Sequence, residues 1–222
     1  MKALNLTLSL LLTFVLFMPA YSQVFQDFGI KAGATISNIQ VTDIGPIEIG
    51  NQFYSVDYIE DNVANPSVAC YTDLFKLDNL DVQAELSYMR KGATRTSTFV
   101  VTTVDNPDGN GQTVSFTNEI GLHYLGLALI AQPWGQVGDA RLYTIVGPTF
   151  SYLLGSSGLL ALPDQLSKFQ VGYTVGVGVD PSKIVKANVF LEIRYNGDVR
   201  YFYDAGAKFW NRSWLFCVGT KL

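Results

Sequence analysis

The sequence has little charge and few of the residues that most often carry catalysis or bind metals. Asp, Glu, Lys and Arg together make up 15% of its 222 residues, histidine occurs once and cysteine twice. The formal net charge is -4, and no cluster of Lys and Arg supplies the positive surface that nucleic acid requires. We therefore exclude a nucleic-acid partner. With 48% hydrophobic residues, the chain is also too apolar to be disordered.

Long apolar segments are absent too, apart from one at the N-terminus. Lys2 precedes an apolar run over residues 4–18, and Ala20-Tyr21-Ser22 has the small-x-small pattern of a cleavage site. The run is shorter than the ~20 residues that a membrane-spanning helix needs, which disfavours an uncleaved anchor. The sequence therefore predicts a signal peptide over residues 1–22 and one exported domain over residues 23–222.

What the chain does have is alternation of apolar and polar residues. Between residues 169 and 179 every odd residue is apolar, and every even one is glycine, glutamine or threonine. A period of two is typical of a β-strand whose two faces meet different surroundings. Pro148 is expected to mark a bulge or local break in one such run. Alternation predicts strands over residues 28–36, 68–75, 80–88, 123–132, 141–154, 169–179, 188–196 and 213–222.

The connections between these strands alternate in length. Long segments at residues 40–65, 93–120, 155–167 and 197–209 alternate with short ones near residues 76–79, 133–139 and 181–186. Outer-membrane barrels combine brief periplasmic turns with longer extracellular loops. The sequence thus predicts an all-β fold: an eight-stranded antiparallel up-and-down transmembrane β-barrel with both chain ends in the periplasm.

Alternation alone leaves open which face is outside, because a soluble lipocalin-like barrel would place its apolar side chains inside. The apolar face, however, carries almost no charge over its middle, and the other face combines glycine with ionisable residues. Aromatic residues lie toward the strand ends, as in interfacial girdles. We therefore expect the apolar face to contact outer-membrane lipid. The expected interfacial aromatics are Phe28, Tyr88, Tyr152, Phe169, Tyr173, Tyr195, Trp210 and Trp214.

Five ionisable residues fall on the inward face of the predicted strands. A barrel of eight strands is filled by its own side chains, and charges in so narrow a lumen must be paired to offset desolvation. We predict a lumen ion-pair network that plugs and rigidifies the barrel, with a proton or ion path as the alternative. Its members are Lys31, Asp81, Glu85, Glu192 and Arg194.

Candidates for other chemistry are few. His123 has no nucleophile motif around it, so we expect an interfacial histidine and no enzyme. Cys70 and Cys217 lie on strands that a third strand separates, beyond the ~7 Å Cα distance that a disulfide allows, so free thiols are expected. Residues 105–111 resemble a calcium loop but lack its final glutamate, and a hairpin tip between residues 94–104 and 112–118 fits better. We expect no metal and no cofactor.

Seven short segments, taken in order, resemble the PorT-like outer-membrane β-barrel proteins, also labelled porin family or outer membrane protein beta-barrel domain. The resemblance spans nearly the whole mature chain and implies an integral outer-membrane barrel; the namesake is similar to proteins tied to a secretion pathway. The chain departs from the pattern at Gly126-Leu127, where a proline is expected, and at its last residue, Leu222, which is not aromatic. The segments are residues 28–33 (FGIKAG), 83–88 (QAELSY) with 91–92 (KG), 124–131 (YLGLALIA), 147–152 (GPTFSY), 176–178 (GVG), 192–196 (EIRYN) and 211–213 (NRS).

Four functions remain open at this point. The first is a structural or interaction barrel whose extracellular loops, especially residues 93–120, contact a surface partner. The second is a narrow transport or secretion-accessory component that works with a secretion or surface complex. The third is a lipid-modifying outer-membrane enzyme that uses His123, and the fourth is a soluble lipocalin-like carrier. We expect the first.

Overall fold

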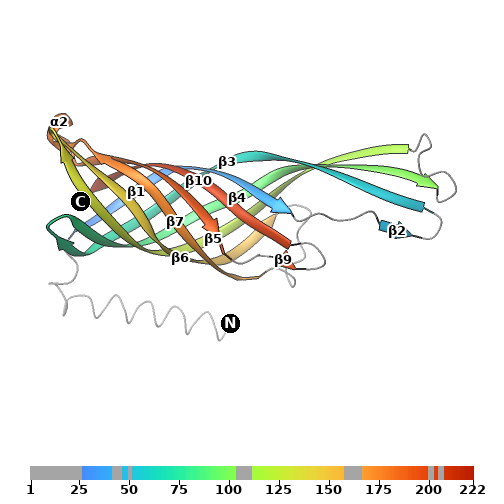
Figure 1. The fold of residues 1–222 in the computed structure, drawn as a ribbon, viewed down its shortest axis with the longest axis horizontal. Helices are drawn as coiled ribbons and strands as arrows, with labels where there is room; N and C mark the ends of the chain where they lie inside the picture. Colours follow the sequence, from blue (N-terminus) through green and yellow to red (C-terminus); the bar gives the residue numbers. More distant parts are fainter. Residues whose placement is uncertain are drawn as a thin grey trace.

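The computed structural model describes residues 27–41, 47–49, 52–103, 112–157, 167–199, 203–204 and 208–222. The expected signal peptide and the hairpin tip at residues 105–111 lie outside these ranges. Nearly all of the described chain is β-strand, and the strands wind around one barrel (Figure 1). The barrel strands are β1 (Phe28–Val41), β3 (Gln52–Leu77), β4 (Leu80–Thr103), β5 (Gln112–Val137), β6 (Ala140–Ser157), β7 (Phe169–Asp180), β8 (Val189–Asp198) and β10 (Lys208–Lys221).

The sheet is closed, because β1 pairs on both of its edges. Gly33 in β1 is opposite Cys217 in β10 on one side and opposite Ser67 in β3 on the other. Every neighbouring pair of barrel strands is antiparallel, and closure leaves no open edge within the wall. The predicted eight-stranded antiparallel barrel is thus confirmed. Two short strands, β2 (Ile47–Ile49) and β9 (Tyr203–Asp204), add to β3 and β10.

The apolar face of the wall points outward. In β8, Leu191 and Ile193 are 48% and 45% exposed, whereas Glu192 between them is 2% exposed. The same alternation continues through β6 and β7, where burial follows the parity expected from the sequence. A lipocalin-like carrier requires the opposite arrangement, so that interpretation was wrong.

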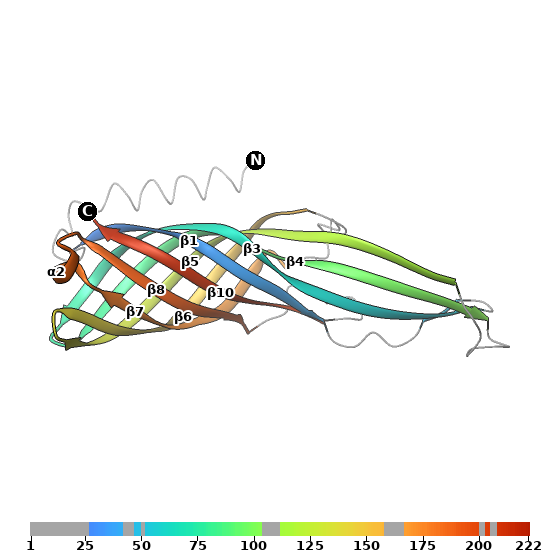
Figure 2. The same cartoon turned by 90° about the horizontal axis from the view of Figure 1, so that it is seen from above.

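Three strands run far beyond the others. Residues 52–62 of β3, 93–103 of β4 and 112–120 of β5 form a projecting sheet in which Gln52 is opposite Thr103 and Val101 is opposite Gln112. In both views this sheet extends away from the barrel on one side (Figures 1 and 2). At the length of a β residue it spans roughly 35 Å. The neighbouring strand β6 joins β5 only from Gly121 onward.

The projecting sheet corrects one expectation and confirms another. Residues 52–65 were expected to be part of a connection, but they belong to β3. Residues 54–58 do alternate between apolar and polar side chains, but the sequence prediction did not recognise this run as a strand. The hairpin arms expected at residues 94–104 and 112–118, in contrast, match the ends of β4 and β5.

The opposite end of the barrel has short links. Two-residue turns join β3 to β4 at Asp78 and Asn79, and β5 to β6 at Gly138 and Asp139. The link from β7 to β8 contains the short helix α2 (Ser182–Val185), which lies at the same end as the C-terminus (Figure 1). In outer-membrane barrels the short turns are periplasmic, so we expect this end to face the periplasm and the projecting sheet to face outside.

Pro148 breaks one ladder locally. On one side Pro148 is opposite Tyr173 in β7. On the other side, the pairing of β5 with β6 stops at Ala128 and Thr149 and resumes at Ala131 and Val146, with the register unchanged. A local break without a bulge is what the missing N–H of proline predicts.

Within the described ranges, no helix is long and apolar enough to cross a bilayer.

Candidate functional site

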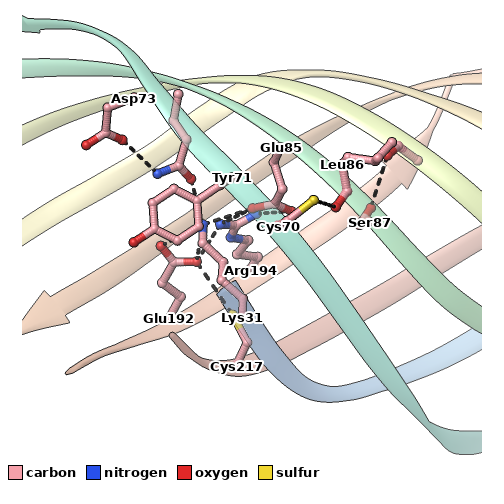
Figure 3. A network of polar contacts seen from close by, with 12 residues as sticks. Lys31, Cys70, Tyr71, Asp73, Glu85, Leu86, Ser87, Glu192, Arg194 and Cys217 are labelled. Carbon is pink, nitrogen blue, oxygen red and sulfur yellow. Dashed lines mark hydrogen bonds and ion pairs between the residues drawn. The ribbon is translucent and has the colours of Figure 1, made fainter. Parts of the chain in front are cut away.

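Four charged side chains meet at the centre of the bore, and we call them the central cluster: Lys31, Glu85, Glu192 and Arg194. Lys31 Nζ lies 2.9 Å from Glu85 Oε2 and 3.2 Å from Glu192 Oε2. Arg194 donates to both oxygens of Glu85, at 3.0 and 2.9 Å, and also pairs with Glu192. Figure 3 shows these side chains, from β1, β4 and β8, pointing toward one another.

The central cluster is buried and balanced. Each of its side chains is at most 4% exposed, and two cations face two carboxylates. Because isolated charges are strongly disfavoured away from water, the arrangement is stable only when all four are present together.

Neutral groups complete the hydrogen bonding of the central cluster. Gln83 accepts a hydrogen bond from Lys31 at 2.7 Å and donates one to Asp73 at 3.1 Å. The Tyr143 hydroxyl donates to Glu192 at 2.9 Å. The ammonium group of Lys31 also lies over the Tyr71 ring, 4.7 Å from its centroid. These contacts leave the cluster enclosed on several sides by polar and aromatic groups (Figure 3).

A glycine makes room for one of these contacts. Gly178 in β7 is opposite Tyr143 in β6, and a Cβ atom at residue 178 would lie 2.3 Å from the Tyr143 ring and 2.6 Å from its hydroxyl. The ring therefore lies against the bare backbone of β7. This placement carries the hydroxyl inward to Glu192.

Asp81, the fifth residue expected in the lumen network, is not part of the central cluster. It pairs with Arg141 nearer the periplasmic end, and the Arg141 guanidinium stacks 4.6 Å from the Trp134 ring centroid. At the same end Lys221 pairs with Asp180 at 3.1 Å. The sequence prediction placed Asp81 inside the barrel with the four residues of the central cluster, but it did not separate Asp81 from them by level.

A third polar level lies on the extracellular side and was missed from the sequence. Lys91 Nζ is 3.3 Å from Asp198 Oδ1 and lies over the Tyr124 ring, 5.4 Å from its centroid. Asn211 donates to the Tyr124 hydroxyl at 3.1 Å. The signal that would have found Lys91 is parity, because it shares the inward face of β4 with Asp81 and Glu85.

Three cavities lined mainly by inward-facing residues of the described strands have volumes of about 20, 20 and 10 Å³. Each is large enough for about one water molecule. At the level of the central cluster these cavities are therefore small.

The aromatic residues expected at the membrane interfaces lie on the outer wall or at its ends. Tyr195 stands between Tyr173, at 6.3 Å between ring centroids, and Trp214, at 5.3 Å. Five residues, Tyr152, Phe169, Tyr173, Tyr195 and Trp214, lie in the extracellular half of their strands, and Trp210 lies further along β10 in that direction. Tyr88 lies before the midpoint of the long strand β4. Phe28 alone begins a strand at the periplasmic end.

The remaining reactive residues are one histidine and two cysteines, and the Cys217 thiol lies 3.5 Å from Glu192 Oε2. His123 faces outward, and its Nδ1 is 2.8 Å from the Tyr88 hydroxyl. Cys70 is exposed on the outer wall and Cys217 is buried inside, so both are free thiols, as expected. Among the described residues, no three His, Cys, Asp or Glu side chains are grouped to hold a metal ion.

A family model described as "Outer membrane protein beta-barrel domain" matches residues 21–197, most of the chain. The chain belongs to this outer membrane protein beta-barrel family. Family membership and the outward apolar wall together make it a protein of the bacterial outer membrane. The matched range includes seven of the eight barrel strands, and β10, which closes the barrel onto β1, follows it. No curated protein matches the sequence.

Several solved outer-membrane barrels are similar to this family member at low identity. OprG from Pseudomonas aeruginosa is 13% identical with a TM-score of 0.45, covering 88% of this chain and 95% of its own. Ail of Yersinia pestis, the attachment invasion locus protein, is 12% identical with a TM-score of 0.41, covering 88% and 98%. Neisserial surface protein A is 14% identical with a TM-score of 0.39, covering 88% and 97%. None of these likenesses assigns a ligand or partner to this chain.

Proposed function

We propose that this protein is an outer-membrane barrel of structural and interaction type, with a bore plugged by its own side chains and a projecting sheet that contacts a partner outside the cell. The observation that carries the proposal is the division of the molecule into two parts. Charged side chains fill the centre of the barrel, whereas three strands continue roughly 35 Å beyond it.

The central cluster supports the plug. Its four charges are paired across the bore from β1, β4 and β8, and the cavities nearby hold about one water molecule each. Passage of an ion or solute would require these pairs to separate in a low-dielectric interior, which is costly.

Conductance tests the plug against the alternative of a narrow transport component. In planar bilayers the protein should give no single-channel current, and Glu85→Ala or Arg194→Ala should open an ion leak. Steady current through the unmodified protein that falls in either variant would instead assign transport, and the plug would be abandoned.

The projecting sheet supports the interaction role. Binding residues are often placed on segments that extend from a rigid scaffold, and this sheet is continuous with three strands of the wall. Thr117 of β5 is exposed in it and bonds to Thr96 of β4 at 3.0 Å.

Crosslinking in intact cells tests this role. A photo-crosslinking amino acid at Thr117 should capture a discrete surface partner, whereas the same residue at Leu127, on the lipid-facing wall, should capture none. The experiment is repeated with the crosslinker at Asp61, which is on β3 in the projecting sheet. If no partner is captured from Thr117 or from Asp61, the interaction role is wrong.

We also infer that the chain is a PorT-like member of its family, on the strength of its seven matching segments. The namesake of that group is similar to proteins tied to a secretion pathway, so the secretion-accessory alternative predicts that disruption of the gene lowers the amount of secreted protein. Unchanged secretion would remove the secretion-accessory alternative. The proposal contains no catalytic role, and a His123→Ala variant should leave the lipid profile of the outer membrane unchanged.

The mature protein is proposed to begin at Gln23 after removal of residues 1–22. Intact-mass measurement of the protein purified from outer membranes should give the mass of residues 23–222. A mass that includes residues 1–22 would contradict cleavage.

A further inference from the structure

The three periplasmic links of the barrel differ in chemistry. The turns at Asp78-Asn79 and Gly138-Asp139 are short, polar and acidic. The link from β7 to β8, over residues 181–188, is longer and carries two exposed lysines around two aliphatic residues. These four residues are Lys183, Ile184, Val185 and Lys186.

The aliphatic residues of this link are more than half exposed. Ile184 is 60% exposed and Val185 is 51% exposed, and no residue of α2 is buried. Moving two adjacent large aliphatic side chains from water into an apolar environment is favourable. Leu222 is also highly exposed, and it follows Lys221, whose backbone N–H donates to Asn188 of the same link. The apolar surface at this corner therefore continues the apolar outer wall.

The link is nevertheless held in a defined shape. The backbone N–H groups of Ile184 and Val185 donate to the Pro181 carbonyl at 2.8 and 3.0 Å. Asp180 accepts from the Ser182 backbone N–H at 3.0 Å and pairs with Lys221 at 3.1 Å. These bonds fix the backbone and direct the two aliphatic side chains away from the protein.

Lys186 has an unusual backbone for a lysine. Its φ of 53° is left-handed, and among the described residues it is the one non-glycine with a positive φ. Glycine or asparagine would adopt this conformation at lower cost. The backbone conformation therefore does not favour a lysine at this position.

We propose that residues 182–186 dock into the periplasmic leaflet of the membrane, with Lys183 and Lys186 binding phospholipid phosphates and Ile184 and Val185 inserted at the acyl boundary. Charge complementarity supports a lipid occupant, because phosphate headgroups are anionic and the two lysines flank the aliphatic pair. Long lysine side chains reach from an apolar surface to the headgroups. The inference is independent of the role proposed for the projecting sheet.

Spin-label accessibility tests this docking. A spin label is attached to Ile184→Cys in a chain that also carries Cys70→Ser, which removes the exposed native thiol; the other native cysteine, Cys217, is buried. The labelled protein is placed in phospholipid nanodiscs, whose two faces are both open to water-soluble probes. Asn79→Cys, in the polar turn, is the matched control. The label at residue 184 should collide more with oxygen and several-fold less with a water-soluble nickel chelate than the label at residue 79. Equal nickel access at both residues would overturn the proposal, and it is also the result that a protein partner would give.

The lysines have a separate test. Lys183→Gln with Lys186→Asn removes both charges, and the asparagine keeps a residue that tolerates the left-handed backbone. In the labelled protein this double variant should raise nickel access at residue 184 several-fold, while the faster migration of the unboiled barrel on a gel is retained. Unchanged access in a folded double variant would overturn the phosphate contact.

Discussion

Glu85 shows how a single residue contributes to the bore. It contacts both cations of the central cluster, from a side chain that is only 4% exposed. Removing one partner from such a set leaves an unpaired charge away from water, which costs more than the pair itself contributes.

Glu85→Gln should therefore lower the free energy of unfolding by about 3–5 kcal/mol. Urea-induced unfolding of the protein in lipid, followed by the heat-dependent gel shift, measures the loss. The matched control is Glu119→Gln, because Glu119 pairs with Arg90 at 2.7 Å but is more than half exposed, and exposed pairs contribute about 1 kcal/mol or less. Equal effects of the two substitutions would contradict a cluster stabilised as a set.

Gly178 allows a second test at this scale. Its missing side chain leaves the space that the Tyr143 ring occupies, so Gly178→Ala must displace the ring and its hydrogen bond to Glu192. We expect a loss of about 1–3 kcal/mol in unfolding free energy. Gly135→Ala is the control, since no atom lies within 4 Å of its ideal Cβ, and it should not destabilise the barrel. A Gly178→Ala variant as stable as the control would show that Tyr143 is not held in this way.

At the scale of the strand, alternation predicted those parts that separate lipid from the bore. Residues 169–179 alternate because one side of β7 meets acyl chains and the other meets side chains within the barrel. Residues 54–58 of the projecting sheet also alternate, as Tyr, Ser, Val, Asp and Tyr, but the sequence prediction placed them in the long connection over residues 40–65. Strand existence was therefore predictable within the membrane, and strand length was not.

Parity also explains what could be predicted of the site. It assigns Lys31, Asp81 and Glu85 to the inside, but it does not give their levels. Asp81 and Glu85 are four residues apart in β4, about 13 Å along the strand, so they cannot contact the same group. Which charges meet depends on the register of several strands around the barrel, and a single sequence does not contain that register.

The projecting sheet should be separable from the barrel. Replacing residues 97–116 by a two-residue turn removes the upper part of β4 and β5 but keeps the pair of Ala93 with Ile120 and all pairs below it. Because the wall is closed by other pairs, the shortened protein should still migrate faster unboiled. Loss of that shift would mean that the projecting strands are needed for the barrel to form.

At the scale of the whole molecule, the two faces of one closed sheet explain both the membrane placement and the paired charges inside the barrel. Outward residues such as Leu127 and Leu129 are about half exposed, whereas Ala128 and Ile130 between them are buried. A closed wall satisfies the backbone, which allows the outer face to be apolar in lipid and leaves the charges inside to pair with one another.

Oxygen accessibility along β5 measures this most directly. Spin labels on single cysteines at residues 125, 127, 128, 129 and 130, in a Cys70→Ser chain in lipid, report whether each side chain contacts acyl chains. The account predicts high oxygen collision rates at residues 125, 127 and 129 and low rates at residues 128 and 130. High rates at residues 128 and 130 with low rates at their odd neighbours, or equal rates at all five, would contradict it.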